Sequence, residues 1–296
     1  MYSDFIQHIL PHQSMDQEHQ QLSLAPVVQM AKDYALINGI SMRAKESCED
    51  DSVVLLPFCL FPSPFPKKSF EYAKFIQKDI NLLIHQVAYN YEFLSSCLKN
   101  TIQTDEFTAN LFSIYEEVMK EGFAQPLSLG LFRSDYMLNS TSKDVNFEDL
   151  EIKQVEINTI ASSFGGLAPR LESLHRLVLN VCGCQELTQK IPVNLAVSGL
   201  ADGLVAAWEV YGKPEAVILF IVEEETYNIS DQRCLEFAVR EKRKDVHVTR
   251  QKFSELQVNA VLKEKELHVK NQEVAVVYFR TGYVPDHYGT QVSGSN

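Results

Sequence analysis

The chain has 296 residues, of which 45% are hydrophobic and 22% charged, a composition typical of a folded globular protein. Asp and Glu number 39 against 27 Lys and Arg, so the formal net charge is -12 and a nucleic acid backbone is repelled at long range. Met1–Leu10 lacks the features of a signal peptide, no apolar run is long enough for a membrane span, and the six cysteines show no CxxC spacing. We therefore expect a cytoplasmic protein without nucleic acid or membrane partners.

The first half of the chain is predicted to be mainly helical. Apolar residues recur at helical spacing over 26–38 and 107–120, and a glycine follows each segment where a helix would end. From Ser69 to Asn100 apolar positions recur at steps of three, four and seven, which predicts one long helix. Four prolines within 55–66 exclude a helix or a central strand and predict an extended connection.

Strand periodicity begins near residue 127. Leu127, Leu129 and Leu131 alternate with other residues, and 152–158 alternates in the same way, which predicts two strands flanking a polar loop near 139–144. A helix is predicted to begin near Pro169, and another to run through 204–211.

The last part of the chain predicts a small α/β domain. Ala216–Val222 is an uninterrupted apolar run, as a parallel strand covered on both faces requires. A helix from Asp231, a strand at 246–248 and a hairpin formed by 266–269 and 274–279 follow. The predicted fold is α/β, with long helices in 1–213, a small parallel-sheet domain in 214–290 and a tail in 291–296.

One predicted strand carries a pair of oxygen ligands. The chain has neither a GxxxxGK[ST] loop nor a GxGxxG motif, which disfavours P-loop enzymes and Rossmann dehydrogenases. The strand period places Glu156 and Asn158 on one face, opposite Val155 and Ile157. A carboxylate beside an amide oxygen suits Mg²⁺. The same alternation also fits a strand face that only meets solvent, so both interpretations stay open.

Three further features suggest recognition of an anion. Ser162–Leu167 supplies hydroxyls and two glycines just before a predicted helix, where backbone N–H groups point outward, although a plain helix-entry loop with a serine cap reads the same way. Arg133 and Arg280 each follow a predicted strand, the place where open α/β sheets present ligand sites. Either arginine is also compatible with a surface salt bridge of little energetic value.

Taken together and in order, five blocks of sequence closely resemble the eukaryotic glutathione synthetases. In chain order the blocks are Leu131–Met137, Gln154–Ile160 followed by Ser163–Leu167, Ala207–Gly212, Asn228–Gln232 and Val276–Tyr283. The resemblance extends from about Pro26 to Tyr288, nearly the whole chain.

This resemblance implies an ATP-grasp-type ligase that joins γ-glutamylcysteine to glycine through an acyl phosphate. It implies that 1–213 is the N-terminal part of the ligase module, that 214–290 is a substrate-binding domain and that the tail 291–296 diverges from the family. ATP, Mg²⁺ and a homodimer are implied with it. By match to the family pattern, Glu156 and Asn158 hold Mg²⁺, and Glu156 also lies beside the nucleotide phosphates. Contacts with the peptide are implied for Arg133, Ser163, Asn228, Gln232, Arg280 and Tyr283, with Arg133 as the catalytic residue. Asp135 is a candidate to orient Arg133.

The sequence also departs from the family pattern. Ala161 stands where the family usually has a serine, and Thr226-Tyr227 stand where it has an acidic residue and an arginine, with Glu223–Glu225 just upstream. Family members continue into lysines, a glycine-rich lid and further acidic ligands of the ATP site. We therefore expect a truncated chain without turnover of its own, the alternative being a non-catalytic isoform that binds peptide or pairs with full-length subunits.

Overall fold

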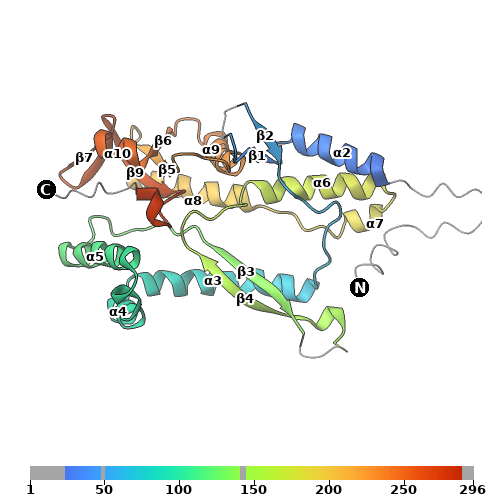
Figure 1. Ribbon diagram of the computed structural model, residues 1–296, viewed down its shortest axis with the longest axis horizontal. Coiled ribbons are helices and arrows are strands. Elements are labelled where there is room, and N and C mark those ends of the chain that lie inside the picture. The colour runs from blue at the N-terminus through green and yellow to red at the C-terminus, as the bar shows by residue number, and fades with distance from the viewer. Residues whose placement is uncertain (1–23, 48–50, 141–144, 289–296) are drawn as a thin grey trace, which may run out of the picture. The chain divides into compact units, whose positions relative to one another are not determined.

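The computed structural model describes residues 24–47, 51–140 and 145–288, and its elements are labelled in Figure 1. Two compact units interleave along the chain. Unit 1 contains described residues within 1–64, 163–202 and 225–242, and unit 2 contains those within 65–162, 203–224 and 243–296. Residue 214 thus lies inside unit 2. The domain boundaries at 213 and 290 stay predictions, and the tail 291–296 lies outside the described residues.

Unit 1 is built from helices around an apolar core. Its helices and strands are α2 (Leu24–Ile37), β1 (Ser41–Arg43), β2 (Val53–Leu55), α6 (Leu167–Val181), α7 (Gln185–Thr188) and α9 (Ile229–Lys242), and α8 (Ala196–Tyr211) begins here and ends in unit 2. Helix α2 packs on α6, with Ala31, Ala35, Leu174 and Val178 fully buried. Small residues on α2 allow the close approach of the two helices, and the helices predicted near 26–38 and from Pro169 are confirmed.

Unit 2 begins with a helical arm and a two-stranded ribbon. The elements are α3 (Lys67–Ala88), α4 (Tyr91–Leu98), η1 (Thr101–Gln103), α5 (Glu106–Glu121), β3 (Arg133–Asn139), η2 (Phe147–Asp149) and β4 (Glu151–Asn158). Strands β3 and β4 pair antiparallel, and α3 contacts β4 (Figure 1). Gly122, at φ +84°, ends α5 as predicted.

The prediction of one helix over 69–100 was wrong, because the helix is interrupted between α3, which ends at Ala88, and α4, which begins at Tyr91. Asn90 caps α4, since its side chain accepts a hydrogen bond from the Phe93 N–H at 3.0 Å. The apolar spacing continues across the break and conceals it. A signal was present in the sequence, because an Asn followed by Glu92 in the first turn is typical of a helix start.

The strand predicted at 127–131 was also wrong. The structure assigns no strand there, and β3 begins at Arg133, which therefore lies at the start of a strand and not after its end. The side chains of Leu129 and Leu131 instead lie close to Gly203 of α8, where the absence of a side chain leaves room for them. The alternation records packing on a helix and not pairing in a sheet.

The rest of unit 2 is a five-stranded sheet with the order β6-β5-β9-β8-β7. Its elements are β5 (Val217–Val222), β6 (Val248–Lys252), α10 (Phe253–Asn259), β7 (Ala260–Lys263), β8 (Glu266–Val269), β9 (Gln272–Phe279) and η3 (Pro285–Tyr288), grouped in orange and red in Figure 1. The α/β class is confirmed. The parallel arrangement holds for β6, β5 and β9, whereas β8 and β7 extend the sheet antiparallel, and β6 begins two residues later than predicted.

Local chemistry explains the order of this sheet. Every residue of β5 is buried, as the apolar run predicts, because β5 is hydrogen-bonded to a parallel neighbour on each side. The predicted hairpin is confirmed, with Lys270 and Asn271 at φ +50° and +64° in the two-residue turn between β8 and β9.

Among the described residues, no helix combines the length and apolar character needed to cross a bilayer.

Candidate functional site

Four polar side chains form a compact cluster at one end of the β3–β4 ribbon. Arg133 pairs in register with Asn158, and Asp135 pairs with Glu156. Residues directly opposite in an antiparallel pair, and residues two apart along a strand, share a face. A bulge follows between Asp135 and Tyr136, where Val155 is the extra residue, so the regular alternation of the ribbon ends beside the cluster.

A bidentate ion pair organises this cluster. The Nε and Nη2 groups of Arg133 donate to the two carboxylate oxygens of Asp135 at 2.9 and 3.0 Å. Nη2 of Arg133 also lies 3.8 Å from Oε1 of Glu156. The hydrogen bonds from Arg133 hold the pKa of Asp135 below its ordinary value, against the opposing effect of desolvation. Asp135 therefore stays ionised and keeps Arg133 in place.

Glu156 and Asn158 lie side by side, as the strand period predicts. Nδ2 of Asn158 donates to Oε1 of Glu156 at 3.1 Å, and the Glu156 side chain is 57% exposed. The exposed carboxylate of Glu156 and the amide of Asn158 supply oxygen atoms of the kind that Mg²⁺ binds, since this ion takes one or two protein oxygens and completes its shell with phosphate and water. The donor set fits the ion, and the metal role of the two residues stays a prediction.

Arg280 is tied to the same part of unit 2 through Ser162. Arg280 directly follows β9 and is only 4% exposed. Nη1 of its guanidinium donates to the main-chain oxygen of Ser162. The hydroxyl of Ser162 donates in turn to the main-chain oxygen of Asn158 at 3.0 Å. A continuous set of hydrogen bonds thus links the end of β9 to the end of β4.

The departure at Ala161 leaves a hydroxyl one position later in the loop. Ala161 itself has φ +51°, a backbone conformation unusual for a residue other than glycine, asparagine or aspartate. The hydroxyl of Ser162 donates to the main-chain oxygen of Asn158 and so closes the loop onto the end of the strand.

Of the glutamates that precede Thr226, Glu224 accepts hydrogen bonds from Ser254, which hold the pKa of its carboxyl below the ordinary value. Glu224 is therefore occupied with α10.

In unit 1 the loop before α6 is capped by Asp231. The Asp231 carboxylate accepts hydrogen bonds from the N–H groups of Phe164, Gly166 and Leu167 at 2.9 to 3.1 Å, and the residue is 4% exposed. The helix has no serine cap, so the expectation of one was wrong. An aspartate from α9 fills that role, and sequence reasoning missed it because the two partners are more than 60 residues apart. Binding of an anion at other groups of this loop stays a prediction.

Three predicted peptide-binding residues lie in this same unit. Nδ2 of Asn228 donates to the hydroxyl of Ser163 at 3.1 Å. Gln232 lies one helical turn further along the chain and is 2% exposed. Oδ1 of Asn228 is buried and has no hydrogen-bond partner among the described residues. An unsatisfied buried acceptor is costly, and an N–H group of a ligand would satisfy it.

Tyr283 follows a turn that requires glycine. Gly282 has φ +99°, and a side chain there would meet the Tyr288 hydroxyl at 3.0 Å. The Gly282 N–H donates to Nδ1 of His287, and its oxygen accepts from the Tyr288 hydroxyl at 2.9 Å. The ring of Tyr283 packs edge-on against His287, with the centroids 4.5 Å apart, and remains about half exposed. The turn presents this ring next in sequence to the strand end that carries Arg280.

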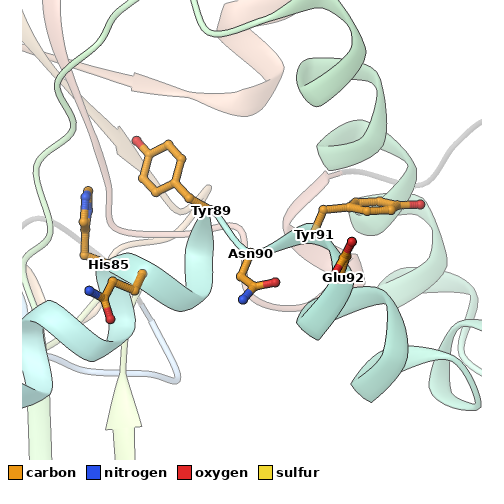
Figure 2. Close-up of a pocket in the computed structure, with 6 residues that line it drawn as sticks. His85, Tyr89, Asn90, Tyr91 and Glu92 are labelled. Carbon is orange, nitrogen blue, oxygen red and sulfur yellow. The ribbon is translucent and has the colours of Figure 1, made fainter.

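The structure therefore gathers the predicted residues into groups within each unit. Arg133, Glu156, Asn158 and, through Ser162, Arg280 are joined in unit 2, whereas Ser163, Asn228 and Gln232 belong to unit 1. None of them lines the pocket of about 520 Å³ at the break between α3 and α4. Figure 2 shows that pocket, which is lined by His85, Gln86, Tyr89, Asn90, Tyr91 and Glu92.

Comparison with known proteins points to one family. The family model for the eukaryotic glutathione synthase, ATP binding domain, matches residues 21–284. The chain is 44% identical to glutathione synthetase of Rattus norvegicus over 270 residues, which are 90% of this chain and 56% of that protein. It is 42% identical to glutathione synthetase of Homo sapiens over 280 residues, or 94% and 57% of the two chains. The chain thus spans about half the length of the curated relatives it matches.

A solved structure shares the fold. The apo form of a glutathione synthetase-like effector from Globodera pallida aligns with a TM-score of 0.73 and 26% sequence identity, covering 92% of this chain and 60% of that chain.

Proposed function

This chain belongs to the eukaryotic glutathione synthase family, and from that premise we propose that it carries the peptide grip and a metal-ligand pair of an ATP-dependent ligase. The proposed reaction joins γ-glutamylcysteine to glycine and forms ADP and phosphate. The cluster of Arg133, Asp135, Glu156 and Asn158 is the main support for the proposal. On one face of the β3–β4 ribbon it sets a fixed guanidinium beside an exposed carboxylate and an amide.

The peptide is an anion that offers both carboxylates and N–H groups. The guanidinium groups of Arg133 and Arg280 are suited to grip carboxylates with paired hydrogen bonds. The buried Oδ1 of Asn228 is an acceptor for an N–H of the peptide. Asn228 is hydrogen-bonded to Ser163, in the loop before α6, and its main-chain oxygen accepts from the N–H of Gln232 on α9. Tyr283 adds an exposed ring after Arg280.

Glu156 and Asn158 are proposed to hold Mg²⁺, with Glu156 also next to the nucleotide phosphates. The ion, when bound, screens phosphate charge during phosphoryl transfer. In the proposed sequence the cysteine carboxylate attacks the γ-phosphorus of ATP and ADP leaves. The glycine amine then attacks the carbonyl carbon of the resulting acyl phosphate, phosphate leaves, and the nitrogen releases a proton to solvent as the peptide bond forms. Arg133 and Arg280 orient the peptide in both steps, because their positive charge holds carboxylates of the peptide.

Two assays test this function. Binding of γ-glutamylcysteine to the chain is measured by calorimetry, and Mn²⁺ binding in the presence of ATP is followed by electron paramagnetic resonance. Glu156→Gln keeps the size of the side chain and removes the anion that a hard cation requires, so Mn²⁺ binding is expected to fall by at least about tenfold. Glu151→Gln, on the same strand but paired with Lys153, is the matched control. Equal Mn²⁺ binding by wild type and Glu156→Gln rules out this metal site.

The second candidate is a chain that binds peptide without turnover or pairs with full-length subunits. An assay for ADP release with γ-glutamylcysteine and glycine separates the two. Release of ADP that depends on both substrates supports the ligase. Peptide binding without ADP release supports the second candidate. The family resemblance extends the proposal to a cytoplasmic homodimer.

A further inference from the structure

The carboxylate of Asp135 contacts both halves of the cluster on the ribbon. Its Oδ1 accepts from Nε of Arg133, and its Oδ2 accepts from Nη2 of Arg133 at 3.0 Å and from Nδ2 of Asn158 at 3.3 Å. Its side chain is one-third exposed. The bulge that follows Asp135 shifts the register by one residue, and regular pairing resumes with Tyr136 opposite Gln154.

The orientation of the Asn158 amide follows from its neighbours. Nδ2 of Asn158 faces three acceptors, which are Oε1 of Glu156, Oδ2 of Asp135 and the main-chain oxygen of Arg133 at 3.5 Å. An ionised carboxylate accepts hydrogen bonds and donates none, so the flipped amide would set oxygen against oxygen. The amide nitrogen must therefore face the carboxylates. This orientation directs Oδ1, the amide atom that can ligate a hard cation, away from them.

The carboxylates of Glu156 and Asp135 differ in their relation to a bound cation. Glu156 is the more exposed and is itself a proposed ligand, so ligation draws on its oxygens. Asp135 is not a proposed ligand, and it accepts two hydrogen bonds from Arg133 and one from Asn158. Building on the proposed function, we propose that Asp135 is a positioning residue that couples the two sites, because one carboxylate fixes both the peptide-gripping guanidinium of Arg133 and the metal-facing amide of Asn158.

Asp135→Asn tests the coupling with a change that preserves size. The amide offers one acceptor atom and one donor group where the carboxylate offered only acceptors, so Arg133 loses a charge-assisted pair and Asn158 loses one of the two carboxylates that orient its amide. We expect γ-glutamylcysteine and Mn²⁺ in the presence of ATP each to bind roughly tenfold more weakly, with an unchanged circular dichroism spectrum. Glu151→Gln, at the other end of the same ribbon, is expected to leave both affinities unchanged.

A double-mutant cycle separates positioning from a general structural effect. If Asp135 acts on the metal through Asn158, Asp135→Asn adds no further loss of Mn²⁺ binding to a chain that already carries Asn158→Ala. The same double variant should still show the loss of peptide binding, since that loss arises through Arg133. Additive losses of Mn²⁺ binding, or an Asp135→Asn variant that binds both ligands like the wild type, overturn the inference. A wild-type chain that binds neither peptide nor Mn²⁺ contradicts the proposed function itself, and the inference falls with it.

Discussion

The helix cap provided by Asp231 shows how one side chain secures the loop that carries Ser163. Its carboxylate accepts hydrogen bonds from three backbone N–H groups at the start of α6. The helix dipole also favours a negative charge at this end of the helix. The cap leaves the hydroxyl of Ser163 to the side chain of Asn228. The rigidity of the predicted peptide contacts in unit 1 therefore depends on a residue that need not contact the peptide.

Asp231→Asn is expected to lower the free energy of unfolding by about 2 kcal/mol, because a buried charged acceptor is replaced by an amide with a single acceptor oxygen. Urea denaturation measures the change. Glu241→Gln removes a charge from an exposed position of the same helix and should stay within about 0.5 kcal/mol of wild type. Coincident urea curves for Asp231→Asn and wild type would show that the cap contributes nothing.

Arg280 provides a second prediction at this scale. Arg280→Lys keeps the positive charge but loses the planar fork, whereas Arg280→Ala loses both. Because the group is buried, we expect the alanine variant to bind γ-glutamylcysteine at least about 30-fold more weakly than wild type, with the lysine variant between the two. Calorimetric titration of the three proteins measures the order. Equal losses in both variants would mean that the fork of the guanidinium is irrelevant.

At the scale of elements, a group of polar contacts, here called the polar clasp, joins the end of α8 to strands β8 and β9. Lys213 forms ion pairs with Glu266 of β8 and with Glu273 of β9, the latter at 2.7 Å, and the Tyr211 hydroxyl donates to Glu273. Glu266, His268 and Glu273 lie within 4.8 Å of one another, and the Lys213 ammonium supplies the positive charge among them. Burial and then the hydrogen bond to Glu273 raise the pKa of Tyr211 to about 12.

This clasp predicts a loss of stability in alkali. A pKa raised on folding means that the protonated phenol is favoured in the native state, so its contribution is complete below about pH 10 and is lost as pH rises towards 12. Allowing for partial exposure, we expect a loss of about 1 kcal/mol from this group. The free energy of unfolding of wild type should fall more steeply between pH 9 and 11.5 than that of Tyr211→Phe. Parallel pH profiles would exclude a contribution from the phenol.

The elements that could be predicted from the sequence are those whose cause is local. The apolar run of β5 and the Lys270-Asn271 turn each contain the information that decides their structure. The break at Asn90 was hidden by an apolar spacing that runs on across it, and the leucines of 127–131 report contact with a distant helix. Within the candidate site, the strand period placed Glu156 beside Asn158, whereas the cap formed by Asp231 depends on tertiary contact and leaves no local signal.

At the scale of the whole molecule, two opposing properties govern behaviour in solution. The net charge of -12 makes copies of the chain repel one another. Helix α3 nevertheless exposes Tyr72, Phe75 and Leu82, spaced three and seven residues apart on one face, and the only residue buried on this helix is Ser69. An apolar helix face open to water favours association with another apolar surface.

These two effects predict salt-dependent self-association. Raising the salt concentration from 0.1 to 1 M shortens the Debye length from about 10 to about 3 Å, which removes most of the repulsion and leaves the apolar attraction in place. Light scattering after gel filtration should therefore show a larger mean mass at 1 M salt, accompanied by binding of an apolar dye. The double substitution of Phe75→Gln and Leu82→Gln leaves the net charge unchanged and removes apolar area from α3, so it should reduce both signals. Because both side chains are more than half exposed, the thermal midpoint should change little. A wild-type chain that is monomeric and binds no dye at both salt concentrations would show that this face has no tendency to associate.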